Sequence, residues 1–181
     1  MDMKLKDLLE EKKSTILTKW FDAIIETYPP DTSNFLKNKK DRFANPMGHI
    51  FTQGIEKILE ALIEEGDLAL GLPFLDDIIK VRAVQDFTPS KAMSFIFALK
   101  NVVRKELEKE IRQSQLSDAL LAFELRIDDL ALLAFDKYLK CREQIYKLKT
   151  DELKRTSFTF LKKANLMSEI PIEEFERRDE E

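Results

Sequence analysis

Cysteine, histidine and glycine are scarce in this chain, and each scarcity excludes a class of functional site. Cys141 is the single cysteine, which excludes an intrachain disulfide and a cysteine-based metal site. His49 is the single histidine, which excludes the paired Glu-x-x-His motifs of metal-binding helical bundles. The four glycines form no phosphate-binding loop, and adjacent carboxylates such as Asp128-Asp129 do not share a helix face. We therefore expect no cofactor, no metal and no enzymatic activity.

Long apolar runs and a strong charge of one sign are also missing. The longest apolar run, around Ala92–Leu99, is far shorter than the roughly 20 residues of a membrane-spanning helix. The N-terminal residues lack the apolar core of a signal peptide. A net charge of −4 argues against a nucleic-acid binder, which usually carries a basic surface. These features predict a cytoplasmic protein without a membrane span.

The positions of proline and glycine predict an all-α chain. Neither residue occurs in the stretch 90–170, which favours long helices there, and apolar residues recur at helical spacing. Thr88 and Pro89 form a cap and first position for one helix, and Pro29-Pro30 ends another. The expected helices span residues 5–28, 32–39, 46–65, 73–84, 89–111 and 116–149. Gly66 is expected to cap the helix that ends at residue 65. The amphipathic segment 151–167 either continues the last helix or folds back.

The helix expected at 116–149 carries two apolar stripes. The first alternates steps of four and three residues, the seam of packed helices, and comprises Leu116, Leu120, Phe123, Ile127 and Leu130. The second comprises Leu121, Leu125, Leu132, Phe135 and Leu139. One stripe can face the chain's own core while the other contacts a second copy. We therefore predict a homodimer through this helix, with the residues of the first stripe as candidates, and the sequence does not decide which stripe forms the interface; the alternative is a helix buried within a single bundle.

Two segments carry a resemblance to a known family: Ile79–Lys100, with the sequence IKVRAVQDFTPSKAMSFIFALK, and Arg42–His49, with the sequence RFANPMGH. Together they resemble the N-terminal domain of the RsbR/RsbD-type RsbT co-antagonists, regulators of the bacterial stressosome, over about residues 4–140. The resemblance implies a globin-like helical bundle without haem, and His49 lies too early in the chain for a globin's axial ligand. It also implies a dimeric input domain for stress signalling. In that family a STAS output domain follows, for which the residues after Lys149 are too few.

Polar and aromatic residues around the second half of this resemblance form a candidate pocket or signalling surface. They are Trp20, Arg82, Gln85, Asp86, Phe87 and Phe95. A globin-like fold without haem can leave apolar space, so a small apolar ligand is a candidate occupant. The alternative is structural: Asp86 helps to cap the helix at Thr88, Arg82 pairs with a carboxylate, and the aromatic residues, with Phe97, belong to the core.

The domain organisation follows from these patterns. We expect a globin-like regulatory domain at residues 1–149 and an amphipathic extension with an acidic tail at 150–181. Residues 169–181 hold seven acids and two arginines, typical of a solvated tail, although such a segment can also dock on a basic helix. Two functions remain open. One is a non-enzymatic sensory module, and the other is an adaptor that binds a partner protein through residues 151–181.

Overall fold

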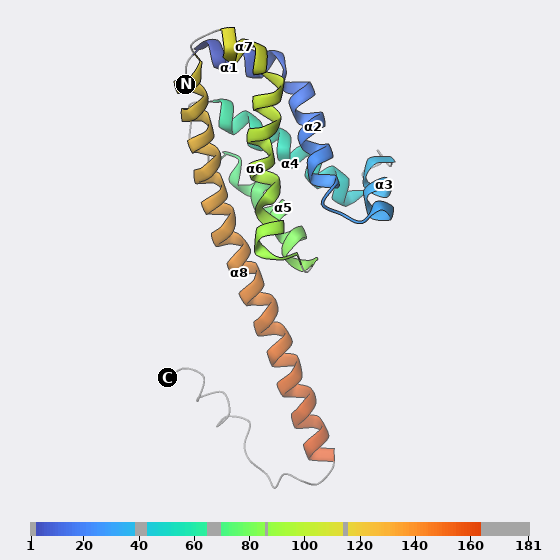
Figure 1. Cartoon of the computed structure of the whole chain (residues 1–181). Coiled ribbons are helices and arrows are strands. Elements are labelled where there is room, and N and C mark those ends of the chain that lie inside the picture. The colour runs from blue at the N-terminus through green and yellow to red at the C-terminus, as the bar shows by residue number, and fades with distance from the viewer. Residues whose placement is uncertain (1–2, 39–42, 65–69, 86, 114–115, 164–181) are drawn as a thin grey trace. The chain divides into compact units, whose positions relative to one another are not determined.

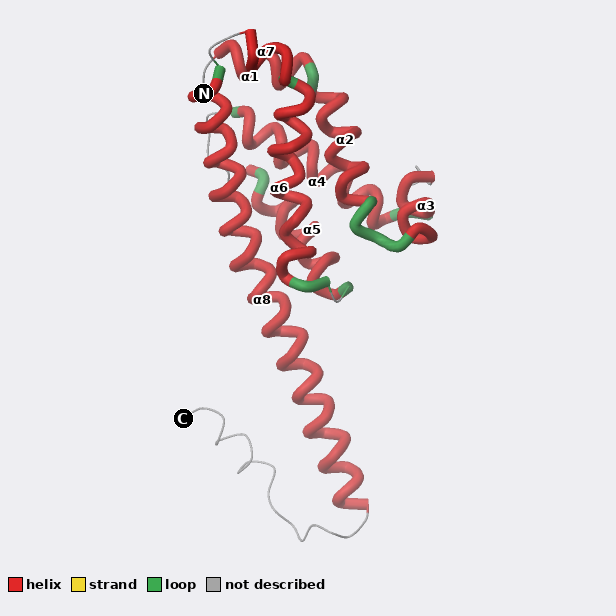
Figure 2. The backbone as a smooth tube through the Cα atoms, in the orientation of Figure 1, coloured by secondary structure: helices red, strands yellow, loops and turns green. Residues whose placement is uncertain are grey.

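The computed structural model describes residues 3–38, 43–64, 70–85, 87–113 and 116–163, and within these ranges the chain forms helices and no strand (Figures 1 and 2). The helices are α1 (Met3–Glu11), α2 (Lys13–Ile25), α3 (Pro30–Asn38), α4 (Pro46–Ile63), α5 (Leu72–Val84), α6 (Pro89–Glu106), α7 (Glu108–Gln113) and α8 (Ser117–Lys163). The predicted all-α class is confirmed. No described helix is both long and apolar enough to cross a bilayer.

The chain divides into two compact units, residues 1–142 and 143–181. In the first unit, α2 packs against both α6 and α4, and α4 packs against α5 (Figure 1). The apolar faces of these helices are fully buried, and Trp20 of α2 joins them to α6, because its indole Nε1 donates a hydrogen bond of 2.7 Å to the carbonyl of Phe95. The two rings also stack, with centroids 6.4 Å apart. This core fixes the ends of α2, α5 and α6, where the candidate site lies.

Side-chain caps begin α4 and α6 at the predicted positions. Asn45 is buried, and its Oδ1 accepts from the backbone N–H of Gly48 at 2.8 Å, while its Nδ2 donates to the carbonyl of Leu36 at 2.9 Å. Pro46 follows at the first helical position, where a missing N–H leaves no bond unmade. Thr88 caps α6 in the same way by accepting from the N–H of Lys91. Local sequence chemistry therefore places both helix starts.

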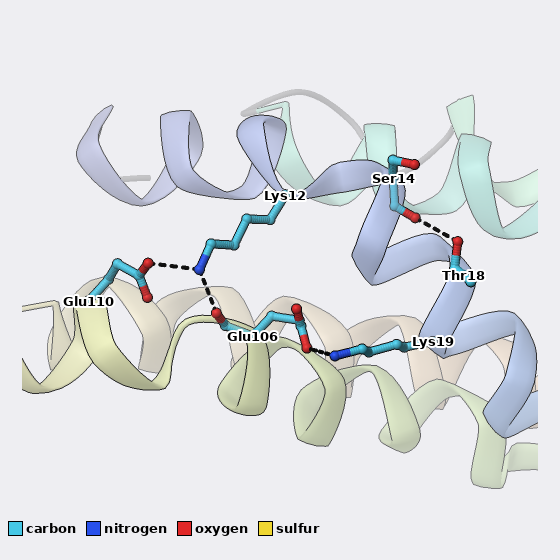
Figure 3. A network of polar contacts seen from close by, with 6 residues as sticks. All are labelled: Lys12, Ser14, Thr18, Lys19, Glu106 and Glu110. Atoms are coloured by element: carbon cyan, nitrogen blue, oxygen red, sulfur yellow. Dashed lines mark hydrogen bonds and ion pairs between the residues drawn. The ribbon is translucent and has the colours of Figure 1, made fainter.

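Two helices that were predicted to be continuous are broken. The helix expected at 5–28 splits at Lys12, and the helix expected at 89–111 splits at Leu107, where ψ is 7° and 14° respectively instead of helical. The breaks are joined to each other (Figure 3): the Lys12 ammonium donates to the carbonyl of Glu106 and to the carboxylate of Glu110, both at 2.7 Å. Lys19 also pairs with the Glu106 carboxylate. A tertiary contact thus sets breaks that the apolar periodicity does not reveal.

The remaining boundaries differ more modestly. α2 ends at Ile25 and α3 begins at Pro30, which takes the first position of that helix, two residues before the expected start. α4 ends at Ile63, and the expected cap at Gly66 lies outside the described residues. α8 runs unbroken to Lys163, so residues 151–163 belong to the long helix, and residues 164–167 lie outside the described residues.

Candidate functional site

Arg82 is the centre of the candidate site and is fully buried, although it is a charged residue in the last turn of α5. It lies between the end of α2 and the first turn of α6. Its Nη2 donates to Thr27 Oγ1 at 3.2 Å and to the carbonyl of Lys91 at 2.8 Å. Three aromatic rings surround the guanidinium, with centroids 4.6–5.6 Å from Cζ: Phe87, Phe95 and Tyr28. Cation–π attraction to these rings offsets part of the lost hydration.

No anion in the described part of the chain pairs with the guanidinium of Arg82. Its Nε and Nη1 have no hydrogen-bond partner, and none of the ion pairs among the described residues includes it. The structural alternative, in which Arg82 pairs with a carboxylate, is therefore wrong for the part of the chain that the structure describes. Burial lowers the pKa of Arg82 from its ordinary value, because desolvation disfavours the charged form. An arginine nevertheless stays charged at neutral pH.

The other buried charge in the described chain is treated differently. Glu124 of α8 is buried, and both of its carboxylate oxygens are bound by Arg104 of α6, from Nε at 2.5 Å and from Nη2 at 2.6 Å. This is the bidentate geometry that satisfies a buried carboxylate. Among the residues that the structure describes, Glu124 therefore has a counter-charge and Arg82 has none.

Tyr28 and Gln85 close the site beside Arg82. The Tyr28 hydroxyl donates to Gln85 Oε1 at 2.8 Å, and Gln85 Nε2 contacts the sulfur of Met47 at 3.0 Å. Burial raises the pKa of Tyr28 to about 12, so the phenol is neutral and cannot serve as the counter-ion of Arg82. Gln85 and Phe87 are only partly buried, and they form the side of the site that reaches solvent.

Most of the predicted site residues come together. Trp20 stacks on Phe95, Phe95 and Phe87 face Arg82, and Gln85 is joined to Tyr28. Asp86, the remaining member of the predicted set, lies outside the described residues. Phe97 was expected in the core, but it is 46% exposed and lies beneath the ammonium of Lys100 instead.

Sequence reasoning missed Thr27, Tyr28 and Tyr138. Tyr28 continues the apolar stripe of α2 four residues after Ile24, and this spacing is the signal that could have identified it. Thr27 and Tyr138 carry no comparable signal, since their roles depend on which helices pack together.

Two side chains of α8 hold the connection between α5 and α6. The hydroxyl of Tyr138, a buried residue, donates to the carbonyl of Phe87 at 2.6 Å. Arg142 Nη1 donates to the carbonyl of Ala83 at 3.0 Å. Both acceptors follow Arg82 in sequence, so the chain that leads from Arg82 to α6 is bound to α8 at Ala83 and at Phe87.

The two stripes of α8 have different surroundings. The side chains of the first stripe, predicted as the candidate dimer interface, are at most 4% exposed and belong to the chain's own core: Leu116, Leu120, Phe123, Ile127 and Leu130. The side chains of the second stripe are between 39% and 68% exposed: Leu121, Leu125, Leu132, Phe135 and Leu139. A partner that contacts this part of α8 would meet the second stripe.

The second stripe also has the spacing of a helix–helix seam. Its steps are four, seven, three and four residues, and Asp128 occupies the position that would divide the step of seven. Asp128 is held by the ammonium of Lys100 at 2.6 Å. The second stripe is therefore an apolar seam with one charged position, Asp128.

One comparison with known proteins gives a match. The family model described as the RsbT co-antagonist protein rsbRD N-terminal domain matches residues 14–153, which include all but the first residue of α2, α3 to α7 and most of α8. No similar protein was found among curated sequences or among solved structures. The globin-like architecture expected from the sequence is compatible with this family.

Proposed function

Because the chain belongs to the family of RsbT co-antagonist rsbRD N-terminal domains, we propose that it is a non-enzymatic input module that works as a homodimer. The family is that of stressosome-related regulatory N-terminal domains. In this proposal the cluster around Arg82 receives a small ligand, and α8 transmits the bound state to the dimer interface.

The observation that carries this proposal is the attachment of the Arg82 cluster to α8. Phe87, whose ring covers the guanidinium at 4.6 Å, has its carbonyl bound by Tyr138. A ligand that displaces the backbone of Phe87 must therefore break that bond or shift α8. Phe135 and Leu139, next to Tyr138 on the same helix, belong to the exposed second stripe. A ligand changes the dimerisation equilibrium only if its contacts with the protein differ between two positions of α8.

The exposed second stripe supports the homodimer. Contiguous exposed apolar side chains on a folded protein mark interaction surfaces, and the heptad-like spacing fits a second helix. A second copy of α8 presents the same spacing, as a twofold interface requires.

Sedimentation equilibrium tests the dimer directly. The wild-type chain is expected to be a dimer at 50 μM, the Leu125→Ser/Leu132→Ser double variant a monomer, and Leu70→Ser still a dimer. Leu70 is the control because it is 70% exposed and lies outside α8. A monomeric wild-type protein at tens of micromolar would contradict the proposal.

The attachment to α8 is tested by Tyr138→Phe, which removes the hydroxyl that bonds Phe87 and keeps the buried ring. The ligand should still bind, but it should no longer change the dissociation constant of the dimer. An unchanged ligand effect in Tyr138→Phe would show that the signal does not pass through this bond.

A second candidate function is an adaptor that binds a partner protein through residues 151–181. It is favoured by the apolar side chains that α8 exposes near its end, since Leu153 is 67% and Phe160 is 69% exposed. The two functions differ under Leu153→Ser/Phe160→Ser, which should abolish partner binding by an adaptor and leave the dimer and ligand binding of an input module unchanged.

A further inference from the structure

Arg82 is the one buried charged side chain in the described chain that lacks a counter-charge, and we propose that it is the receptor for a small organic carboxylate. The inference gives a ligand class to the proposed input function and rests on that function only for its biological meaning. It replaces the apolar ligand expected from the sequence with an anionic one.

The hydrogen-bonding capacity of Arg82 is the first argument. A guanidinium has five N–H groups, and the two on Nη2 are used by Thr27 and Lys91. The N–H groups of Nε and Nη1 are buried and have no acceptor. Buried donors are nearly always satisfied in native proteins, and an unsatisfied charged donor is costly. A carboxylate supplies both the acceptor oxygens and the missing negative charge.

The start of α6 is the second argument. Arg82 bonds to the carbonyl of Lys91 in the first turn of this 18-residue helix, so its guanidinium lies at the positive end of the helix dipole. That turn contains no acidic residue. A cation at a helix N-terminus is unfavourable, whereas an anion there is stabilised by the free N–H groups and by the dipole. Helix and arginine therefore favour the same charge.

The surroundings of Arg82 define the rest of the ligand. The rings of Tyr28, Phe87 and Phe95 provide an apolar surface around a single buried cation. A monoanion matches one cation, and an apolar body matches the aromatic surface. Gln85 and Phe87, the partly exposed members of the site, mark the side from which such a ligand would enter. The chemistry thus fits an aromatic or short aliphatic monocarboxylate.

Thermal unfolding with benzoate tests the inference on the full-length chain. At constant ionic strength, set with sodium chloride, sodium benzoate should raise the Tm of the wild type by about 5–10 °C at a hundredfold excess over Kd. Benzamide, the neutral isostere, should not. Arg82→Met should lose the response, while Arg112→Met, which removes an exposed arginine of α7, should keep it.

Two results would overturn the carboxylate receptor. One is an equal rise in Tm for the wild type and Arg82→Met, which would place benzoate elsewhere. The other is the absence of any rise in the wild type up to 20 mM benzoate and 20 mM propionate. If Arg82→Met does not fold, the test uses the wild type alone and follows the Nε–H resonance of Arg82 by NMR spectroscopy. That resonance should shift with benzoate and not with benzamide, and no shift contradicts the inference.

The dimer dissociation constant, measured in the same solutions, separates this inference from the proposed function. Benzoate binding at Arg82 without a change in the dimer supports the receptor and contradicts the input module. A change in the dimer that persists in Arg82→Met contradicts the receptor and leaves the input module standing.

Discussion

Replacing Arg82 by methionine is the most informative perturbation, because it separates a structural arginine from a ligand receptor. The change removes the two hydrogen bonds from Nη2, each worth about 1.5–3 kcal/mol for a charged donor, and the cation–π contacts with three rings. It also removes the desolvation penalty of an unpaired buried cation, which amounts to several kcal/mol. The two effects are of similar size and opposite sign.

The groups that Arg82 contacts remain satisfied after the change. Thr27 Oγ1 still donates to the carbonyl of Ile24 at 2.7 Å, and the carbonyl of Lys91 still accepts from Ser94 Oγ at 2.8 Å. Methionine fills the site with a flexible thioether that packs well against aromatic rings. We therefore expect the free energy of unfolding of Arg82→Met to be within about 1 kcal/mol of wild type, or higher.

Two further substitutions at Arg82 calibrate this expectation. Arg82→Ala should lose about 2–4 kcal/mol, because it leaves a cavity among the rings. Arg82→Lys should also be less stable than Arg82→Met, since it keeps a buried charge and loses the planar group that stacks. Urea unfolding followed by circular dichroism at 222 nm, with slopes compared across variants, measures all three.

The refuting result is a loss of more than about 3 kcal/mol in Arg82→Met. That loss would mean that the hydrogen bonds and ring contacts outweigh the desolvation penalty, and Arg82 would then be explained by stability alone. A stable Arg82→Met variant that no longer responds to benzoate would instead show that Arg82 serves binding and not stability. Residues at functional sites often lower the stability of a protein in this way.

Three other predictions concern capping and pH. Gly48→Ala should lower the free energy of unfolding by about 1–2 kcal/mol, because its Cβ would lie 2.3 Å from Nδ2 of the capping Asn45; unchanged urea stability would contradict the cap's role. Hydrogen bonds from Lys80 and, secondarily, from Lys137 hold the pKa of Asp76 below its ordinary value. The stabilisation that the ionised Asp76 carboxylate gives to the folded state is therefore present above pH 3.8 and is lost as pH falls. Asp76→Asn should therefore flatten the decline of the urea midpoint between pH 4 and pH 2.5, and an identical decline would count against the ion pair. Because burial raises the pKa of Tyr28, the neutral phenol stabilises the folded state fully below pH 10, and this stabilisation is lost toward pH 12. Absorbance at 295 nm should show a late phenol titration that is missing in Tyr28→Phe.

The helix starts could be predicted from the sequence because they depend on local chemistry. Asn45-Pro46 and Thr88-Pro89 cap their own helices, and each needs contacts with residues only a few positions away. The breaks at Lys12 and Leu107 could not, because the ammonium of Lys12 reaches α6 and α7 about a hundred positions later in the chain. Helical hydrogen bonds continue on both sides of Lys12, so the apolar period hides the break.

The candidate site was predicted in composition and not in electrostatics. The residue pattern brought Arg82 together with its aromatic neighbours, but a spacing cannot say whether a counter-charge is present. Likewise, both stripes of α8 have seam-like spacing, and only the arrangement of α4, α5 and α6 in the folded chain decides which stripe is buried. The pairing of Glu124 with Arg104 shows the same limit, because Glu124 reads as a solvated residue in the sequence.

The alternation of inward and outward residues along α8 explains how one helix can serve both the core and a partner. Ala134 and Tyr138 are buried, while Phe135 and Leu139, each one position further along, are exposed. A helix is stiff over this length, so a rotation that moves Tyr138 relative to Phe87 also moves its outward neighbours. Packed interfaces favour discrete arrangements over gradual ones, and a seam that is interrupted by Asp128 has little excess stability with which to resist a change. A carboxylate that neutralises Arg82 and displaces Phe87 would act at a residue whose carbonyl accepts a hydrogen bond from Tyr138.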